Sequence, residues 1–485
     1  MNFNSSIFLL YFLPLFLILY FILSRELKNW LLLLTSVFFY AWGAPKFVFF
    51  MAGALLADFF IVGVMNNKEG KSRRLLLWLS VVLNLGLLLW FKYMNFFVDQ
   101  VDTILNGLGL QSVGWTRIAL PVGISFITFQ KLAYTLDVFK RHFKPFERLQ
   151  DFALYIFMFP QLLSGPIVRP GQLSGQIWNR AENDNLNLKI TGFYRFVIGL
   201  AKKVIIADTL AFQVNEIFAL DPFQLSSALA WIGAIAYTFQ IYFDFSGYTD
   251  MAIGLARMLG FRLPENFRNP YISGSITEFW RRWHITLSFW FRDYVFLPLA
   301  FATSRKLPKE KYLGLRADKM IYLIAVLVTF LLCGFWHGAA WTFILWGAYQ
   351  GLFLILDRMF LLRLLKKTGK LIPVMLTFAF TAVGWVLFRS GTIHDGLGFI
   401  GKMFSFRSGD NDVWLNPKFW TMFAIAALIS FTGLIKGAEA RQEQFYLEPG
   451  NKILLIMALP VLILLVLSVA TITGAGFSPF IYFRF

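Results

Sequence analysis

Long apolar stretches recur along the chain, each close to the roughly 20 residues that an α-helix needs to cross a bilayer. Clear examples are residues 7–23, 75–97 and 453–469. Of the 485 residues, 58% are hydrophobic and 15% are charged, whereas a soluble protein carries about a quarter charged residues. A transmembrane β-barrel would show alternating segments of about ten residues, and none dominate here. The pattern predicts an all-α polytopic membrane protein.

Basic residues gather in the short loops between the apolar stretches, and the net charge is +18. The positive-inside rule assigns such loops to the cytoplasm, which explains the charge better than nucleic-acid binding does. These loops are residues 68–74, 140–148, 305–319 and 363–370. With the loops inside, the chain would have roughly eleven transmembrane helices, with both termini extracytoplasmic. We expect the membrane to be the bacterial cytoplasmic membrane.

The stretch from residue 151 to 300 does not resemble simple spans, because prolines interrupt it and charged residues mix with apolar ones. Such segments survive at membrane depth only where protein buries them or a cavity hydrates them. We expect re-entrant and in-plane helices here, around a central tunnel or funnel. The chain 1–485 would then be one membrane domain, with N-terminal spans in 1–150, a catalytic core in 151–362, and C-terminal spans with an extracytoplasmic aromatic tail in 363–485.

One of the four histidines, His337, lies between two long apolar stretches and is flanked by Gly334 and Gly338. A titratable group at membrane depth is costly, so it indicates function by default. Neutral imidazole can take a proton near pH 7, which makes His337 a candidate general base in a membrane enzyme. The histidines are too scattered to predict a metal site. The single cysteine, Cys333, lies one turn before His337 and is interpreted as a packing residue rather than an acyl-cysteine nucleophile.

A second polar block spans residues 242–294, again between apolar stretches. On one continuous helix, Trp280, His284 and Ser288 would share a face. So many polar groups between apolar spans are costly unless they line a wet or reactive cavity.

Charged residues in the same block favour ion pairs and contacts between helices. Glu278 is spaced to reach Arg281 or Arg282 on a neighbouring face of the same helix. Asp244 and Asp250 fit polar contacts that hold helices together.

The two blocks, with several shorter motifs, resemble the membrane-bound O-acyltransferase (MBOAT) family, in particular its bacterial branch that acetylates alginate and acylates cell-wall polymers. No single motif suffices, but the ordered set is highly specific and covers most of the chain. The motifs lie at residues 39–42, 91–93, 121–126, 160–162, 165–169, 240–299 and 336–341.

The resemblance implies that a cytosolic acyl donor meets an outward-facing hydroxyl in a buried tunnel. The family's invariant histidine maps to His337, and its second active-site position maps to His284. The chemistry agrees, because an alcohol is a weak nucleophile until a base accepts its proton. The oxyanion also needs hydrogen-bond donors, for which His284, the backbone amides near Gly338 and tryptophan indoles are candidates.

Further site residues are assigned from their place in these motifs. Arg281 and Arg282 are candidates for contacts to donor phosphates, although pairing with Glu278 or with lipid headgroups is the simpler explanation. The residues expected to line the tunnel are Trp280, Trp283, Trp336, Asp244, Ser246 and Asn269.

The aromatic C-terminal tail, residues 478–485, is placed outside the membrane or at its outer face by the loop count. Its simplest interpretation is an interfacial anchor. A second interpretation is that the Tyr482 hydroxyl takes the acyl group first and passes it on to a partner enzyme or to the polymer.

Together these features predict an O-acyltransferase that delivers an acyl group, most simply acetyl from acetyl-CoA, to hydroxyls of an extracytoplasmic polysaccharide. Alginate-like exopolysaccharide and peptidoglycan are the first acceptors to consider. The donor is a substrate, and no bound cofactor is expected. A periplasmic acyltransferase partner is expected, because the chain has no soluble domain that could grip a long glycan. The alternatives are D-alanyl transfer to teichoic acid, a flippase of lipid-linked sugars, and a non-catalytic scaffold.

Overall fold

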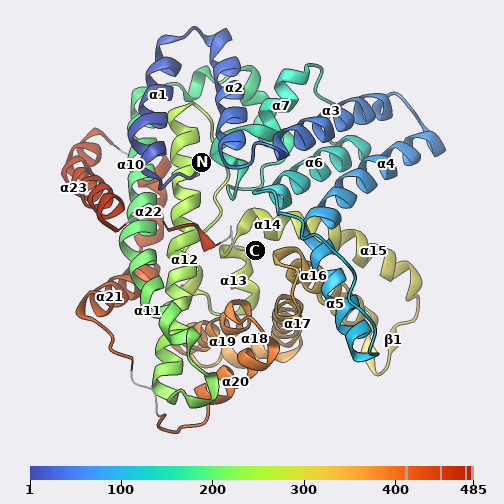
Figure 1. Cartoon of the computed structure of the whole chain (residues 1–485), viewed down its shortest axis with the longest axis vertical. Coiled ribbons are helices and arrows are strands. Elements are labelled where there is room, and N and C mark those ends of the chain that lie inside the picture. Colours follow the sequence, from blue (N-terminus) through green and yellow to red (C-terminus); the bar gives the residue numbers. More distant parts are fainter. Residues whose placement is uncertain (410–412, 448–449, 476–477, 482–485) are drawn as a thin grey trace. The chain divides into compact units, whose positions relative to one another are not determined.

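The computed structural model describes residues 1–409, 413–447, 450–475 and 478–481, and most of these are helical. They form two compact units, each described here by itself (Figure 1). The first comprises Met1–Phe193 and Ala252–Pro264, and the second comprises Tyr194–Met251 and Glu265–Phe485. Two long helices, α10 (Leu186–Ala201) and α12 (Ser227–Met258), each contribute residues to both units.

The remaining elements divide cleanly between the units. The first unit holds α1 (Leu13–Ile22), α2 (Arg25–Gly43), α3 (Phe47–Asn66), α4 (Gly70–Leu88), α5 (Met94–Gly107), α6 (Ile124–Phe139), α7 (Leu149–Phe157), α8 (Phe159–Leu162) and α9 (Pro170–Trp178). The second holds α11 (Asp208–Ala219), α13 (Ile276–Arg282), α14 (Ile285–Phe291), α15 (Leu297–Lys306), β1 (Lys311–Tyr312), β2 (Leu315–Arg316), α16 (Ala317–His337), α17 (Trp341–Leu356), α18 (Leu362–Leu365), α19 (Leu371–Arg389), α20 (Ile393–Met403), α21 (Pro417–Phe431), α22 (Ala438–Leu447) and α23 (Asn451–Ala475). The two strands pair antiparallel as a short hairpin.

Eight helical segments among the described residues are long and apolar enough to cross a membrane, so the chain is polytopic as predicted. This criterion gives fewer spans than the expected eleven. The apolar helix Phe8–Ile22 is shorter than the 18 residues taken as the minimum for a span. The helix α6 has only 16 residues and carries a buried lysine, while α2 begins with three charged residues in its first four. The spans are Phe47–Asn66, Gly70–Gly107, Ile285–Lys306, Ala317–His337, Trp341–Leu365, Leu371–Arg389, Pro417–Leu434 and Asn451–Gly474.

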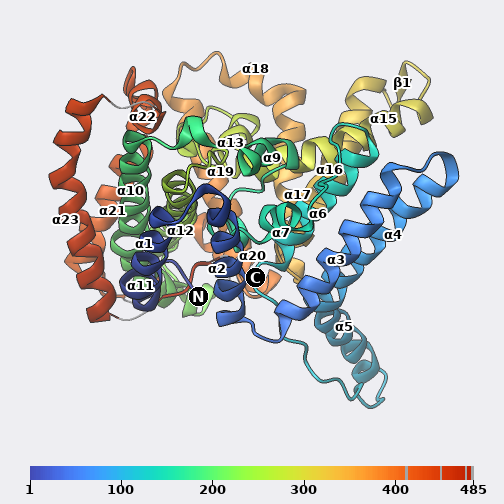
Figure 2. The ribbon, with the colours of Figure 1, turned by 90° about the horizontal axis from the view of Figure 1, so that it is seen from above.

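In the first unit, α3, α4 and α6 pack together around a buried polar network (Figure 2). Asp58 lies 3.0 Å from the ammonium of Lys131, and both side chains are almost fully buried. The same carboxylate accepts hydrogen bonds from Ser80 and Asn84 on α4, at 2.7 and 2.8 Å. Each oxygen of Asp58 therefore has a partner, which is the condition under which a charge persists in an apolar helix group.

In the second unit, α16 and α17 form a tight helical hairpin that fixes the end of α16 (Figure 1). The two backbones meet at Gly334 and Gly347. A Cβ atom on either glycine would overlap a backbone carbonyl of the facing helix, that of Phe343 or that of Phe330. Only glycine permits this approach, and it brings the last turn of α16 against α17.

The helix expected through residues 280–288 is broken, so the prediction of one shared face for Trp280, His284 and Ser288 was wrong. The helix α13 ends at Arg282, and His284 takes the left-handed conformation at φ 42°, ψ 53° before α14 begins. A loop pairs with the break: Arg268 donates to the carbonyl of Arg282, and Ile285 donates to the carbonyl of Asn266, both at 2.9 Å. Groups that would be unsatisfied at the helix ends are thus bonded by tertiary partners.

Candidate active site

His337 is the last residue of α16, and its side chain is held within a group of aromatic rings. Its ring centroid lies 4.9 Å from that of Trp336, 5.1 Å from that of Trp346 on α17 and 5.2 Å from that of Phe388 on α19. Only 4% of the residue is exposed. The helical hairpin and α19 thus place the imidazole in an apolar setting within the second unit.

Tryptophans form a continuous layer beside His337. The rings of Trp346 and Trp385 stack at 5.8 Å and 18°, and Trp283 lies 4.8 Å from Trp385. Trp280 lies 5.8 Å from Trp346 and donates to the Gln350 side chain at 3.3 Å. Among the described residues, the buried indole N–H groups of Trp346 and Trp385 have no acceptor. They are therefore available to a ligand that carries a developing negative charge.

His284 is fully buried, and its ring lies close to the same aromatic group. It packs edge-on against Phe245 of α12 at 4.7 Å and lies 6.4 Å from Trp336. Its Nδ1 is 3.1 Å from the side-chain oxygen of Asn266. His284 directly precedes the span Ile285–Lys306 and lies outside it. Burial lowers the pKa of His284 to about 3, because the charged form loses hydration. The rings of both predicted histidines thus lie beside Trp336, at centroid distances of 6.4 Å for His284 and 4.9 Å for His337.

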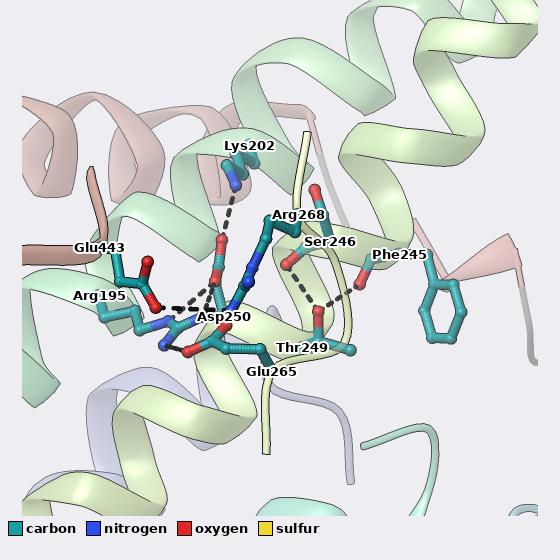
Figure 3. Close-up of polar contacts among 9 residues, drawn as sticks. All are labelled: Arg195, Lys202, Phe245, Ser246, Thr249, Asp250, Glu265, Arg268 and Glu443. Carbon is teal, nitrogen blue, oxygen red and sulfur yellow. Dashed lines mark hydrogen bonds and ion pairs between the residues drawn. The ribbon is translucent and has the colours of Figure 1, made fainter. Parts of the chain in front are cut away.

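A charged cavity of about 90 Å³ adjoins His284 through Asn266, which forms part of its wall. Arg195 forms ion pairs with Glu265 and with Asp250, at 2.5 and 2.8 Å. Lys202 approaches the second oxygen of Asp250 at 2.6 Å (Figure 3). Each base in this cluster therefore faces an acid, and the cavity offers no excess of positive charge.

Two of the predicted tunnel residues, Ser246 and Asn269, line this cavity. The Ser246 side chain is buried, and its Oγ has no partner among the described residues. Asn269 takes a left-handed conformation at φ 42° and donates to Gln442 of α22 at 3.0 Å. The helix α22 also contributes Glu443, which lies 3.5 Å from Arg268 at the exposed edge of the cluster (Figure 3).

Asp244, another predicted tunnel residue, holds the C-terminal tail. Its Oδ1 lies 2.6 Å from the ammonium of Lys203, and its Oδ2 accepts a hydrogen bond from the backbone N–H of Ile481 at 2.9 Å. Lys203 also donates to the carbonyl of Pro479 at 3.2 Å. The ring of Phe480 packs against Tyr248, one helical turn beyond Asp244, at 4.8 Å. Tyr482, the candidate relay, lies outside the described residues.

The two arginines proposed for donor phosphates differ in their surroundings. Arg282 pairs with Glu278 at 2.9 Å, which confirms the predicted i,i+4 contact, and it also pairs with Glu439 of α22 at 2.5 Å. Its positive charge is therefore already offset by two carboxylates. Arg281 is exposed.

Sequence reasoning missed several residues that shape this site: Asn266, Lys203, Arg195, Trp346 and Trp385. Asn266 falls inside the polar block, but nothing in its spacing indicates a histidine partner. Lys203 belongs to a pair of lysines that directly follows an apolar stretch, and this pair was the available signal. Among the described residues, no three histidine, cysteine, aspartate or glutamate side chains gather as they would for a metal ion.

Comparison with known proteins gives a consistent result. Residues 124–368 match the model of the membrane-bound O-acyltransferase family. The chain is 39% identical to a probable alginate O-acetylase of Pseudomonas putida, over the full length of both. It is 34% identical to a peptidoglycan O-acetyltransferase of Helicobacter pylori, covering 81% of this chain and 78% of the relative. A teichoic acid D-alanyltransferase of Bacillus subtilis is 30% identical, over 56% of this chain and 69% of the relative.

The family match spans half of the chain and contains both histidines, the break at His284 and the α16–α17 hairpin. With the buried imidazoles and the aromatic layer, it sets the reaction class as acyl transfer within a membrane. The chain belongs to the membrane-bound O-acyltransferase family and is an O-acyltransferase.

Proposed function

We propose that this enzyme moves an acetyl group from cytosolic acetyl-CoA to hydroxyls of an extracytoplasmic polysaccharide. The relatives named for alginate and peptidoglycan acetylation support this, because they match over most of the chain. The observation that carries the proposal is the pair of buried imidazoles, His337 and His284, on one tryptophan ring. We place the enzyme in the bacterial cytoplasmic membrane with both termini extracytoplasmic, on the strength of the basic loops.

In the proposed mechanism, His337 is the general base. It accepts the proton of the acceptor hydroxyl as the oxygen attacks the thioester carbonyl. A C–O bond forms and the carbonyl oxygen becomes an oxyanion, which the indole N–H groups of Trp346 and Trp385 stabilise. The C–S bond then breaks, and the proton on His337 passes to the departing thiolate. The aromatic layer limits access of water, which would otherwise take the acyl group.

Substrates would reach His284 from two directions along α12. Asp244 holds the tail, whereas Asp250 faces the charged cavity beside α22. Six residues of α-helix separate them, a rise of roughly 9 Å. The loop topology places α22 in the cytoplasm and the tail outside. His284 packs on Phe245, which is next to Asp244 on α12. We propose that a donor from one compartment meets an acceptor from the other beside His284.

The remaining predicted residues take supporting roles in this proposal. Trp280, Trp283 and Trp336 form the aromatic wall, and Ser246 and Asn269 contact substrate from the charged cavity. Arg281 is the better placed of the two arginines for a donor phosphate, because it is exposed whereas Arg282 already pairs with two carboxylates.

We further propose that Tyr482 accepts the acetyl group first and passes it to a periplasmic acyltransferase partner or to the polymer. The docking of residues 479–481 supports this relay, because Ile481 contacts Asp244 of α12, the helix on which His284 packs. A Tyr482→Phe variant that keeps full transfer to the polymer would refute the relay while leaving direct transfer intact.

The test of the acyltransferase uses the purified protein in lipid nanodiscs with radiolabelled acetyl-CoA and a soluble polysaccharide acceptor. We expect His337→Ala to lower acetyl release from the thioester by about 10²- to 10⁴-fold, the usual contribution of a general base. The matched control is His394→Ala, which changes an exposed histidine that packs against Phe223 and should leave the rate unchanged.

Two further measurements separate the alternatives. Passage of a lipid-linked sugar across liposomes that survives His337→Ala, with no thioester consumed by the wild type, would indicate a flippase. Consumption of a D-alanyl carrier protein thioester but not of acetyl-CoA would indicate D-alanyl transfer, the activity in the name of the Bacillus subtilis relative.

A further inference from the structure

The side chain of Asn266 joins the two parts of the break at His284. Its Oδ1 lies 3.1 Å from Nδ1 of His284, 3.2 Å from the backbone nitrogen of Thr286 and 2.9 Å from the Thr286 hydroxyl. Its backbone carbonyl accepts a hydrogen bond from Ile285 at 2.9 Å. Asn266 is fully buried, so no part of this geometry depends on a mobile surface group.

One of these contacts fixes the orientation of the carboxamide. The oxygen and nitrogen of an asparagine side chain are distinguished by their partners, because their shapes are nearly the same. The backbone N–H of Thr286 can only donate, so the atom that faces it must be the acceptor Oδ1. The reverse orientation would set an NH₂ group against an N–H group in a fully buried position.

The same oxygen lies within hydrogen-bond distance of Nδ1 of His284. An oxygen of a carboxamide carries no proton, so the proton in this contact must reside on Nδ1. A neutral imidazole carries one proton only, which leaves Nε2 as an acceptor. A carboxamide also differs from a carboxylate, because it orients the ring without stabilising a positive charge on it.

We propose that Asn266 is a positioning residue that holds His284 as the neutral tautomer with its proton on Nδ1, so that Nε2 accepts a hydrogen bond from a substrate hydroxyl. This inference rests on the proposed function. It replaces the expectation that His284 donates to the oxyanion, since Nε2 in this tautomer has no proton to donate. In direct transfer to a sugar, which carries several hydroxyls, one hydroxyl can donate to His284 while its neighbour gives its proton to His337; in the Tyr482 relay, the tyrosine hydroxyl gives its proton to His337 and a second donor meets His284.

The tautomer can be measured directly in the full-length protein. Histidine labelled with ¹⁵N in nanodisc-embedded protein gives signals from only four residues, and the signals lost in His284→Gln identify those of His284. We expect a protonated Nδ1 and an unprotonated Nε2 in the wild type. A wild-type spectrum with a bare Nδ1 and a protonated Nε2 would overturn the proposal.

Two variants of Asn266 test whether this residue is the cause. Asn266→Ala removes the acceptor, and we expect the Nε2-protonated tautomer to appear, with a loss of transfer of roughly 10- to 100-fold, as for other residues that orient a histidine. Asn266→Asp keeps the shape and the acceptor but adds a charge, and it should protonate both ring nitrogens of His284 at neutral pH. An unchanged His284 spectrum in both variants would overturn the proposal, and the aspartate variant supplies this test even if the alanine variant does not fold.

The spectroscopic result is independent of the proposed function. If the wild type shows the expected tautomer but His284→Gln retains full acetyl transfer, then Asn266 positions the ring and the catalytic role of His284 is wrong. If the tautomer is reversed while His284→Gln is inactive, then the catalytic role stands and the part assigned to Asn266 is wrong.

Discussion

Two buried lysine–aspartate pairs in this enzyme have the same chemistry and different surroundings. In the first unit, Lys131 and Asp58 lie 3.0 Å apart within α3, α4 and α6. In the second, Lys202 and Asp250 lie 2.6 Å apart in the wall of the charged cavity. The Asp58 side chain is 0% exposed and meets its partners on neighbouring helices, whereas the side chain of Lys202 is 15% exposed.

A buried ion pair alone therefore does not mark a functional site. Both pairs meet the default expectation that charges at membrane depth are functional. The Lys202–Asp250 pair adjoins a cavity whose wall also holds a buried polar atom, Oγ of Ser246, that has no partner among the described residues. Under the proposed function, this cavity and the unpaired oxygen of Ser246 would connect the pair to substrate.

The Lys131–Asp58 pair is called the closed pair below. Removal of one of its charges should have the largest effect on stability. Asp58→Ala leaves Lys131 as an uncompensated charge that the packed helices cannot hydrate. Losses of about 3–5 kcal/mol follow from breaking such pairs, and thermal unfolding in nanodiscs measures the change. The double variant Asp58→Asn with Lys131→Met should recover much of this loss, because no charge remains buried. The acetyl transfer rate of the folded fraction should stay at the wild-type level, and a specific loss of activity would contradict the structural role.

The Lys202–Asp250 pair, called the open pair, should respond differently from the closed pair. Its removal should cost less stability and more activity. Asp250→Ala leaves Arg195 paired with Glu265, and the adjoining cavity can hydrate Lys202. We expect a cost of about 1–3 kcal/mol, typical of a group left without its partner. Transfer should fall because the same cavity is bounded by Asn266, which holds His284. Equal activity in Asp250→Ala and wild type would remove the cavity from the mechanism.

The helical composition, the MBOAT family and the burial of His337 among aromatic residues could be predicted from the sequence, because apolar length and aromatic motifs are local properties. The break at His284 could not, since it depends on Asn266 from a separate loop that bonds the freed backbone groups. The Asp58–Lys131 pair was missed for the same reason: its members come from α3 and α6. Ion pairing of Arg282 with Glu278 was predictable because both residues lie on one helical turn.

Lys203 and Asp244 form a third buried lysine–aspartate pair, which also contacts the tail. Substitution of Asp244 tests whether this pair holds the tail in place. Asp244→Ala removes the acceptor for the N–H of Ile481 and the charge opposite Lys203. A hydrogen bond to a charged group contributes about 1.5–3 kcal/mol, so docking of the tail should weaken by roughly tenfold or more. Faster removal of the tail by carboxypeptidase, followed by mass spectrometry, measures the change.

A matched control separates the docking of the tail from the charge of Lys203. Asp208 also pairs with Lys203, at 2.8 Å, and it hydrogen-bonds Ser478 of the tail as well, so the control is made at Asp244 itself. Asp244→Asn keeps a side-chain oxygen for the N–H of Ile481 but removes the charge opposite Lys203. It should leave the tail better protected from carboxypeptidase than Asp244→Ala does, and equal digestion of both variants would place the effect on the charge of Lys203 alone.

The smallest effect is expected at Cys333, one turn before His337 on α16. Its thiol is buried, so it resembles the closed pair of the first unit in its lack of access, although it lies close to the proposed base. Cys333→Ala removes one sulfur atom from a packed position, which should cost about 1 kcal/mol, as for other small deletions in a core. The transfer rate should stay within twofold of the wild type. A loss that approaches that of His337→Ala, with an acyl group found on Cys333 by mass spectrometry, would show that proximity to the base, rather than access to a cavity, decides which buried groups react.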